Sequence, residues 1–144
     1  MKRNLIGLSL VVFSLLLTTT SAYSQSAAKA YVPFAFKAGG AQLPPGNYEL
    51  RAKADSDIVT IYNRETRKTT LALATVREDS PRYAPGKLVF HSYGNQHFLA
   101  AIWGGAYTRG VLFSPCKQEK QMQQMQQVAS GTANTGKEVT IALK

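Results

Sequence analysis

Five side chains in one stretch of this sequence have the chemistry that a functional site would need. They are His91, Ser92, Tyr93, His97 and Trp103, all within KLVFHSYGNQHFLAAIW at positions 87–103. An imidazole can act as a general base or bind a metal ion, and a hydroxyl beside it can become a nucleophile. Large aromatic side chains can line a ligand cleft, although they more often form the core and cross-strand pairs.

The backbone that must position these residues is predicted to be a β-hairpin. Apolar, β-prone residues stand on both sides of Gly94-Asn95, and a glycine at the first turn position favours a type II′ turn. With a two-residue turn, Ser92 pairs with His97, and His91 then points to the opposite face of the sheet. Large apolar side chains on both faces predict a central rather than an edge position for this hairpin.

Neither histidine has the sequence neighbours that catalysis or metal binding requires. A three-residue loop, Gly94–Gln96, would put both imidazoles on one face, but a metal site would still need a third ligand. The hairpin contains no acidic residue, and the nearest are Glu78 and Asp79. A nucleophile at Ser92 would need an orienting acid and an oxyanion hole, and no Gly-x-Ser-x-Gly elbow is present. We therefore predict no catalytic residue, no metal and no cofactor, and a protein that is not an enzyme.

The first residues have the organisation of a secretory signal peptide. Lys2 and Arg3 precede an apolar run from Leu5 to Leu17, which is shorter than the roughly 20 residues that a transmembrane helix needs. Small residues predict cleavage after Ser24, with a second candidate after Ala30. Residues 1–24 are thus a predicted signal peptide, and residues 25–144 are predicted to form one secreted or periplasmic domain that does not span the membrane.

The charge and the cysteine content limit the partners that we consider. The chain has 17 Lys and Arg against 8 Asp and Glu, for a net charge of +9. An anionic partner would explain this excess, but we favour solubility, because acidic residues interrupt the basic segments. Export argues against nucleic acid as a partner. The single cysteine, Cys116, cannot form an internal disulfide, and we favour a buried free thiol over a dimer linked through Cys116.

The rest of the chain consists mainly of short extended segments separated by turn signals. Segments with period-two alternation or β-branched enrichment are 30–37, 47–53, 58–62, 68–77, the two arms of the hairpin, 106–113 and 137–143. Strands this close in sequence cannot be parallel neighbours. We predict an all-β fold, an antiparallel sandwich or small barrel of about eight strands.

One segment near the C-terminus has the composition of a helix. Ser114 and Pro115 suit the N-cap and the first helical position, and the residues that follow are rich in Gln, Lys and Met. We predict one short helix over about 115–129, before a last strand over about 137–143. Its narrow apolar stripe predicts a helix that lies on the surface or covers an open end of the sheet.

Three blocks carry a family resemblance. They are VPFAF at 32–36, LPPGNYEL at 43–50 and the hairpin at 87–103. In this order they resemble small exported β-rich proteins of bacteria to which no function is assigned. The resemblance covers the mature domain up to the helix. It implies a secreted, mostly β protein, and it implies no activity, ligand or catalytic residue.

These features lead to three hypotheses about function. We favour an exported, non-catalytic β-domain that acts as an interaction or structural module toward an envelope or extracellular component. The alternative is a carrier of a small apolar ligand in a barrel-like cavity. The least favoured is a hydrolase or metalloenzyme that uses His91 or His97.

Overall fold

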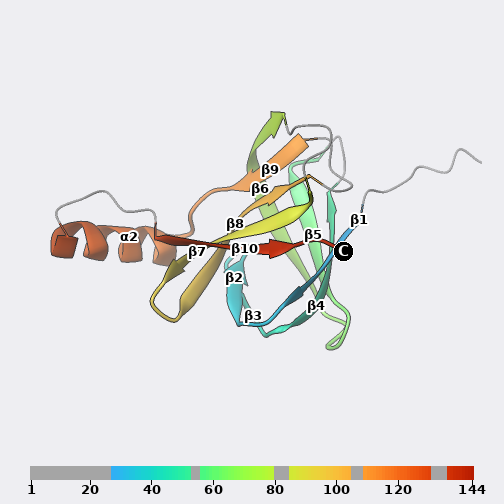
Figure 1. The fold of residues 1–144 in the computed structure, drawn as a ribbon, viewed down its shortest axis with the longest axis horizontal. Coiled ribbons are helices and arrows are strands. Elements are labelled where there is room, and N and C mark those ends of the chain that lie inside the picture. Colours follow the sequence, from blue (N-terminus) through green and yellow to red (C-terminus); the bar gives the residue numbers. More distant parts are fainter. Residues whose placement is uncertain (1–26, 53–55, 80–84, 105–108, 131–135) are drawn as a thin grey trace, which may run out of the picture.

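A computed structural model describes residues 27–52, 56–79, 85–104, 109–130 and 136–144, so the predicted signal peptide lies outside the described residues. These ranges contain ten strands and one helix (Figure 1). The strands are β1 (Ala27–Val32), β2 (Phe36–Ala38), β3 (Ala41–Leu43), β4 (Gly46–Ala52), β5 (Ile58–Asn63), β6 (Thr69–Asp79), β7 (Lys87–Tyr93), β8 (Gln96–Trp103), β9 (Arg109–Phe113) and β10 (Lys137–Ala142). The helix is α2 (Lys117–Ser130).

The strands form one mixed, open sheet that curls around a single core. Its main path runs β10-β7-β8-β9-β6-β5-β4-β1, and β2 with β3 branches from β8. Among the described strands, the pairing of β2 with β8 is parallel and the others are antiparallel. The two ends of the path approach each other, because Lys144 N donates a 2.8 Å hydrogen bond to Lys29 O. The predicted all-β fold with one short helix near the C-terminus is confirmed, and the sheet is not a closed barrel.

Strand β6 joins two halves of the sheet: β1, β4 and β5 form one half, and β7, β8, β9 and β10 form most of the other. Its residues 69–73 pair with β5, and residues 74–79 pair with β9. The register shifts between Ala74 and Val76, which is a bulge of the kind that bends a strand and increases its twist. Ala72 and Ala74 are buried on the inner face of this strand. One long strand therefore carries the chain from one half of the sheet into the other.

The predicted hairpin is confirmed in its register. Tyr93 pairs with Gln96, Ser92 with His97, and His91 with the residue after His97. Gly94 has φ of 61°, and the following residue is not among those with positive φ, as a type II′ turn requires. Both arms are interior strands, since β7 lies between β8 and β10, and β8 lies between β7 and β9.

The segment 30–37 is not the single strand that the sequence predicted. Strand β1 ends at Val32 and pairs with β4, whereas β2 begins at Phe36 and pairs with β3 and β8. Pro33 lies between them, and it has no amide hydrogen with which to continue a ladder. Val32 and Phe36 are nevertheless both buried in the same core.

The helix begins later than predicted. Its first turn is closed by Lys120 N donating to Cys116 O at 3.0 Å, and α2 starts at Lys117 rather than at position 115. Ser114 does not cap it, because Cys116 is the residue that directly precedes α2; the Ser114 hydroxyl instead accepts a 2.8 Å hydrogen bond from Thr75 Oγ1. The hydroxyl thus ties the end of β9 to β6. The far end of α2 projects away from the sheet (Figure 1), and Val128 there is 89% exposed.

Aromatic rings fill the interior of the curled sheet. Phe36 lies edge-to-face against Phe90, with centroids 5.3 Å apart, and against Tyr48, at 5.1 Å. Phe90 is fully buried and Tyr48 is 1% exposed. Aliphatic side chains from both halves complete this core: Val32, Leu50, Val59, Ile61, Leu88, Ile102 and Val111.

Candidate functional site

An open groove of about 440 Å³ lies beside β8, at the point where the strand paired with one of its edges changes from β9 to β2. β9 pairs with β8 at Ala101 and Ile102, whereas β2 takes that edge at Phe98. Between these pairings the wall of the sheet is open, and β6 and the start of α2 bound the gap. The lining includes Lys37, Gly39, Leu71, Leu73, Thr75, Phe98, Leu99, Phe113, Ser114, Cys116 and Glu119.

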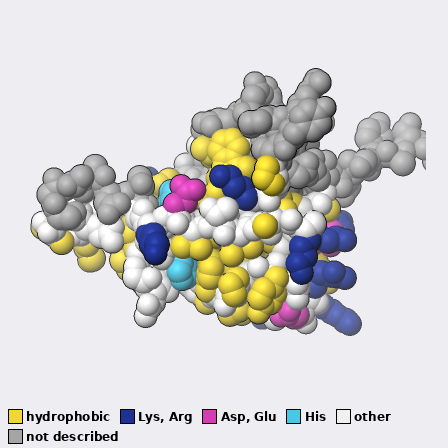
Figure 2. Space-filling model, in the orientation of Figure 1, with side chains coloured by type: hydrophobic (Ala, Val, Ile, Leu, Met, Phe, Trp, Pro, Cys, Tyr) yellow, Lys and Arg dark blue, Asp and Glu magenta, His cyan; other side chains and the backbone are white. Residues whose placement is uncertain are grey.

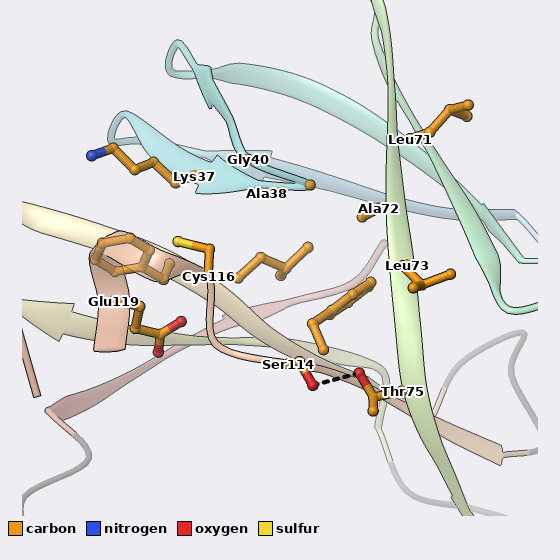
Figure 3. Close-up of a pocket in the computed structure, with 14 residues that line it drawn as sticks. Lys37, Ala38, Gly40, Leu71, Ala72, Leu73, Thr75, Ser114, Cys116 and Glu119 are labelled. Carbon is orange, nitrogen blue, oxygen red and sulfur yellow. Dashed lines mark hydrogen bonds between the residues drawn. The ribbon is translucent and has the colours of Figure 1, made fainter. Parts of the chain in front are cut away.

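The groove has one polar end and one apolar side. Figure 3 shows Lys37, Cys116 and Glu119 grouped at one end, with β6 across the groove; Ala72 of this strand points toward the groove, whereas the side chains of Leu71 and Leu73 point away from it. Lys37 and Glu119 are the charged residues among the described lining side chains. An amphipathic cleft of this volume lies within the range that small-molecule sites occupy, roughly 300–1,000 Å³.

Lys37 is held at the polar end by neutral partners. Its Nζ donates to Gln96 Oε1 at 3.1 Å and to Gln118 Oε1 at 2.7 Å, and it lies 5.5 Å from the centroid of the Phe98 ring. No carboxylate of the described residues is within ion-pair distance of this ammonium group. The positive charge of Lys37 is therefore oriented but not neutralised.

Glu119 and His91 form one of the contacts that attach α2 to the sheet. Glu119 lies in the first turn of the helix and is 3% exposed, and its Oε1 is 2.8 Å from His91 Nδ1 on β7. A carboxylate at this position also interacts favourably with the helix dipole. The imidazole of His91 is thus engaged in docking the helix.

His97 lies on the other face of the hairpin, as the two-residue turn predicted. Its ring packs on Phe34 with centroids 4.1 Å apart, and its Nδ1 is buried without a hydrogen-bond partner among the described residues. Ser92 stands opposite His97, but its hydroxyl donates to Gly94 O at 3.4 Å. The described residues do not join Ser92, His97 and an acid in one arrangement.

Tyr93 and Trp103 have structural contacts. The Tyr93 hydroxyl accepts a 3.0 Å hydrogen bond from Gln123 Nε2 of α2, and burial raises the pKa of this phenol. Trp103 packs over Gly110, where a Cβ would come within 2.3 Å of the indole. The structure therefore does not bring the five predicted candidates together: His91 and Tyr93 face α2, His97 faces Phe34, and Trp103 packs on β9.

The part of the chain that the structure describes holds no group of three His, Cys, Asp or Glu side chains placed to bind a metal ion. Its helix is too short and too polar to cross a bilayer. Cys116 is half-buried and lines the groove as a free thiol.

The outer face of β1, β4, β5 and β6 changes from charged to apolar across the sheet. Opposite residues on this face form the row Lys29–Glu49–Tyr62–Thr69 and the row Arg51–Thr60–Leu71, with Ile58 opposite Leu73 at one side. Ile58, Leu71 and Leu73, which we call the apolar strip, are 45%, 58% and 69% exposed. The apolar strip adjoins the groove, because residues 71–73 of β6 border the groove while the Leu71 and Leu73 side chains point to the outer face of the sheet (Figure 3).

The opposite side of this face carries a basic cluster, defined as Lys29, Arg51 and Arg64. Arg51 donates to Glu49 Oε1 through Nε at 2.8 Å and Nη2 at 2.6 Å. That hydrogen bonding, with the charges of Lys29 and Arg64, lowers the pKa of the Glu49 carboxyl. Figure 2 shows Lys and Arg side chains gathered at the end of the molecule where β1 and β4 lie.

The sequence did not reveal the groove or the apolar strip. In LALAT, at positions 71–75, leucine alternates with alanine, so either face could be the buried one. The structure buries the alanines and exposes the leucines. Lys37 and Cys116 are far apart in the chain, and only strand order brings them to one groove.

Comparison of the chain with protein-family models, with curated proteins and with solved structures finds no significant match in any of the three. Its function must therefore be argued from the surface features themselves.

Proposed function

We propose that this protein is an exported, non-catalytic binding module that contacts an envelope or extracellular component through the apolar strip. The observation that carries the proposal is the exposure of Leu71 and Leu73, at 58% and 69%, on a sheet face beside an open groove. Contiguous exposed apolar side chains on a soluble domain are typical of interaction sites. The signal-like N-terminus and the resemblance to exported bacterial proteins support the location.

The roles of the imidazoles support a non-catalytic function. His91 is bonded to a buried carboxylate that docks α2, and His97 is packed on Phe34. Each histidine is thus accounted for by a contact that stabilises the fold. A general base must reach a substrate proton, and these contacts direct both rings toward the protein.

The basic cluster supports a partner with anionic groups at one side of its contact surface. Lys29 and Arg51 lie on the same sheet face as the apolar strip, on either side of Glu49 along the strand rows, and the charge of Arg64, just after β5, also acts on Glu49. Exposed charges of this kind accelerate association more than they strengthen the complex.

Site-directed photo-crosslinking in the producing cell tests the proposal. A photoreactive residue at position 71 or 73 should give an adduct of defined mass in the secreted or periplasmic fraction. Position 95, exposed at the hairpin turn, is the matched control and should give none. The substitution Ile58→Asp should reduce the adduct formed from position 73, because residue 58 lies directly opposite it. No adduct from the strip, or the same adduct from position 95, would overturn the proposal.

The groove favours a second candidate function, the binding of a small apolar ligand. Its volume of about 440 Å³ is sufficient for one small molecule. The groove lies on the flank of the sheet between β2, β6 and β9 rather than in the mouth of a barrel. This function does not depend on the apolar strip having a macromolecular partner.

A further inference from the structure

We propose that the apolar strip and the cations beside it bind the surface of an anionic phospholipid bilayer. Ile58, Leu71 and Leu73 enter the boundary between the lipid headgroups and the acyl chains. Lys29 and Arg51, on the same sheet face, lie at the lipid phosphates. The proposal rests on the proposed function and deepens it, because it names the envelope component that the apolar strip contacts. Binding of this kind depends on buried apolar area together with electrostatic attraction to anionic lipids.

The apolar strip projects from the outer face of the curled sheet. Figure 3 shows the Leu71 and Leu73 side chains extending from β6 in the same direction, away from the groove. Ile58 stands directly opposite Leu73 on β5, so the three side chains form one patch. Strand β5 is paired along both edges, with β4 and with β6, and its ladder groups are satisfied within the sheet. The strip can therefore leave water without taking unpaired backbone groups of β5 with it.

The side-chain types in the apolar strip favour lipid over a protein partner. Residues that dominate protein–protein interfaces are enriched in Trp, Tyr and Arg, whereas Leu is under-represented among them. Those residues also meet pockets on the other protein, but the strip lies on the convex side of a sheet that curls around its core, with its leucines directed away from the groove. Aliphatic side chains on a convex surface fit among acyl chains, because a bilayer has no fixed shape to match.

The nearest cations lie at a distance from the strip that allows contact with headgroups. Arg51, Thr60 and Leu71 stand opposite one another on three adjacent strands. Arg51 and Leu71 are therefore two strand spacings, or roughly 10 Å, apart. Two of the five N–H donors of Arg51 bond to Glu49, so three remain for phosphate oxygens. Lys29 is exposed and makes no side-chain hydrogen bond within the described part of the chain. Both side chains can keep their charged groups in the polar layer while their methylene stems cover apolar surface.

Positive charge exceeds negative charge around the strip. The described residues of β1, β4, β5 and the turns on either side of β5 hold five cations and three acids: Lys29, Arg51, Arg64, Arg67 and Lys68, with Glu49, Asp57 and Glu65. Two of the acids are bonded within the protein, because Glu49 accepts from Arg51 and Glu65 accepts from Asn47. The cations are spread along the sheet and its turn rather than converging on one point. This distribution suits a surface of uniform negative charge better than a single anion.

Flotation with lipid vesicles tests the proposal on protein purified from the secreted or periplasmic fraction. The probes are vesicles of phosphatidylcholine alone and vesicles of an equal mixture of phosphatidylcholine and phosphatidylglycerol. The affinity for the anionic vesicles should be higher by about tenfold or more, because one cation near an anionic surface raises the affinity about fivefold. The preference should weaken as salt is added, since exposed charges are screened.

Variants at exposed positions separate the strip and its cations from the rest of the surface. Leu73→Ser should lower the affinity for anionic vesicles about tenfold. Val128→Ser, which removes an aliphatic side chain that is 89% exposed on α2, is the matched control and should retain the affinity. Lys29→Gln should lower the affinity for anionic vesicles about fivefold and leave binding to phosphatidylcholine unchanged. Lys117→Gln, exposed on α2, makes the same change in net charge and should retain the preference.

The outcomes distinguish the membrane from the function beneath it. No flotation with either vesicle, equal affinity for the two compositions, or equal losses in Leu73→Ser and Val128→Ser would overturn membrane binding. If positions 71 and 73 then still cross-link to a protein, the proposed function stands with a protein as its partner. If they give no adduct, the proposed function is overturned as well. A phospholipid adduct at these positions would support both proposals.

Discussion

Gly39 is the residue that lets the turn after β2 lie against β6. Its φ is 57°, and a Cβ at this position would come within 2.1 Å of Leu71 O. Neighbouring Gly40 also has a positive φ, of 80°, but a Cβ there would meet nothing within 4 Å. A side chain at position 39 would therefore meet both backbone strain and a steric conflict, whereas a side chain at position 40 would meet backbone strain alone.

We expect Gly39→Ala to lower the free energy of unfolding by about 3 kcal/mol, from backbone strain and overpacking together. Gly40→Ala should cost about 1 kcal/mol, from strain alone. Urea denaturation of both variants measures the difference. Equal losses would mean that the turn after β2 can move away from β6.

Tyr48 should make stability depend on alkaline pH. Its hydroxyl donates to Pro44 O, and burial raises the pKa of the phenol above its usual 10.0. A group with a raised pKa in the folded state stabilises it fully below the unfolded pKa. That contribution is lost as the pH rises above about 10 toward the folded pKa, because the unfolded state ionises first.

Tyr48→Phe should therefore be less stable at pH 7, by about 1 kcal/mol for the lost hydrogen bond, but should lose less stability between pH 9 and 11. Thermal or urea unfolding across this range is the measurement. Tyr31→Phe, which changes a half-exposed phenol, is the control and should follow the unmodified protein. A steeper alkaline loss in Tyr48→Phe than in the unmodified protein would contradict the prediction.

At the scale of the element, α2 depends on its first two turns. Glu119 bonds to His91 and Gln123 to Tyr93, whereas Met125 and Val128 are 68% and 89% exposed. Helices of this length are marginal in water without tertiary contacts. The docked turns must therefore stabilise the remainder.

Glu119→Ala should lower the free energy of unfolding by about 1–2 kcal/mol, because it leaves the half-buried His91 imidazole without its partner. It should also reduce the helical signal in circular dichroism. Lys120→Ala, at the next, exposed position, should change stability by less than about 0.5 kcal/mol. An unchanged helical signal in Glu119→Ala would show that other contacts suffice to dock α2.

Local signals in the sequence predicted the elements whose geometry is set locally. The turn at Gly94 determined the register of the β7–β8 hairpin, and alternation in 47–53 predicted the strand β4, which buries Tyr48 and Leu50. The predictions were wrong at positions where residues distant in the sequence determine the local structure. The break at Pro33 reflects pairing of β1 with β4 and of β2 with β8, and Ser114 bonds to Thr75 and lies ahead of the start of α2.

At the scale of the whole molecule, the candidate site depends on strand order, which short-range patterns do not encode. The groove joins β2, β6, β8 and the β9–α2 connection, and residues 37 and 119 at its polar end are separated by most of the domain. The histidines were conspicuous by type, yet the structure gives both of them internal contacts. The side chains that line the groove are mostly apolar, with one lysine at its end, and these are common types without a chemical signature.

The sharing of β6 between both halves has a consequence for how the domain opens. The amide of Ala72 lies in the ladder with β5. Ala74 is the first residue of β6 that pairs with β9, and its amide donates to Asp57 O, just before β5, at 2.6 Å. Separating either half of the sheet must expose this strand. The molecule should therefore behave as one foldon, in which amide protons on β5, β6 and β8 exchange with deuterium only through global opening. Native-state hydrogen exchange at increasing denaturant should bring these amides onto one isotherm, with the distal turns of α2 exchanging far earlier. Two separate isotherms for β5 and β8 would show that the halves open independently.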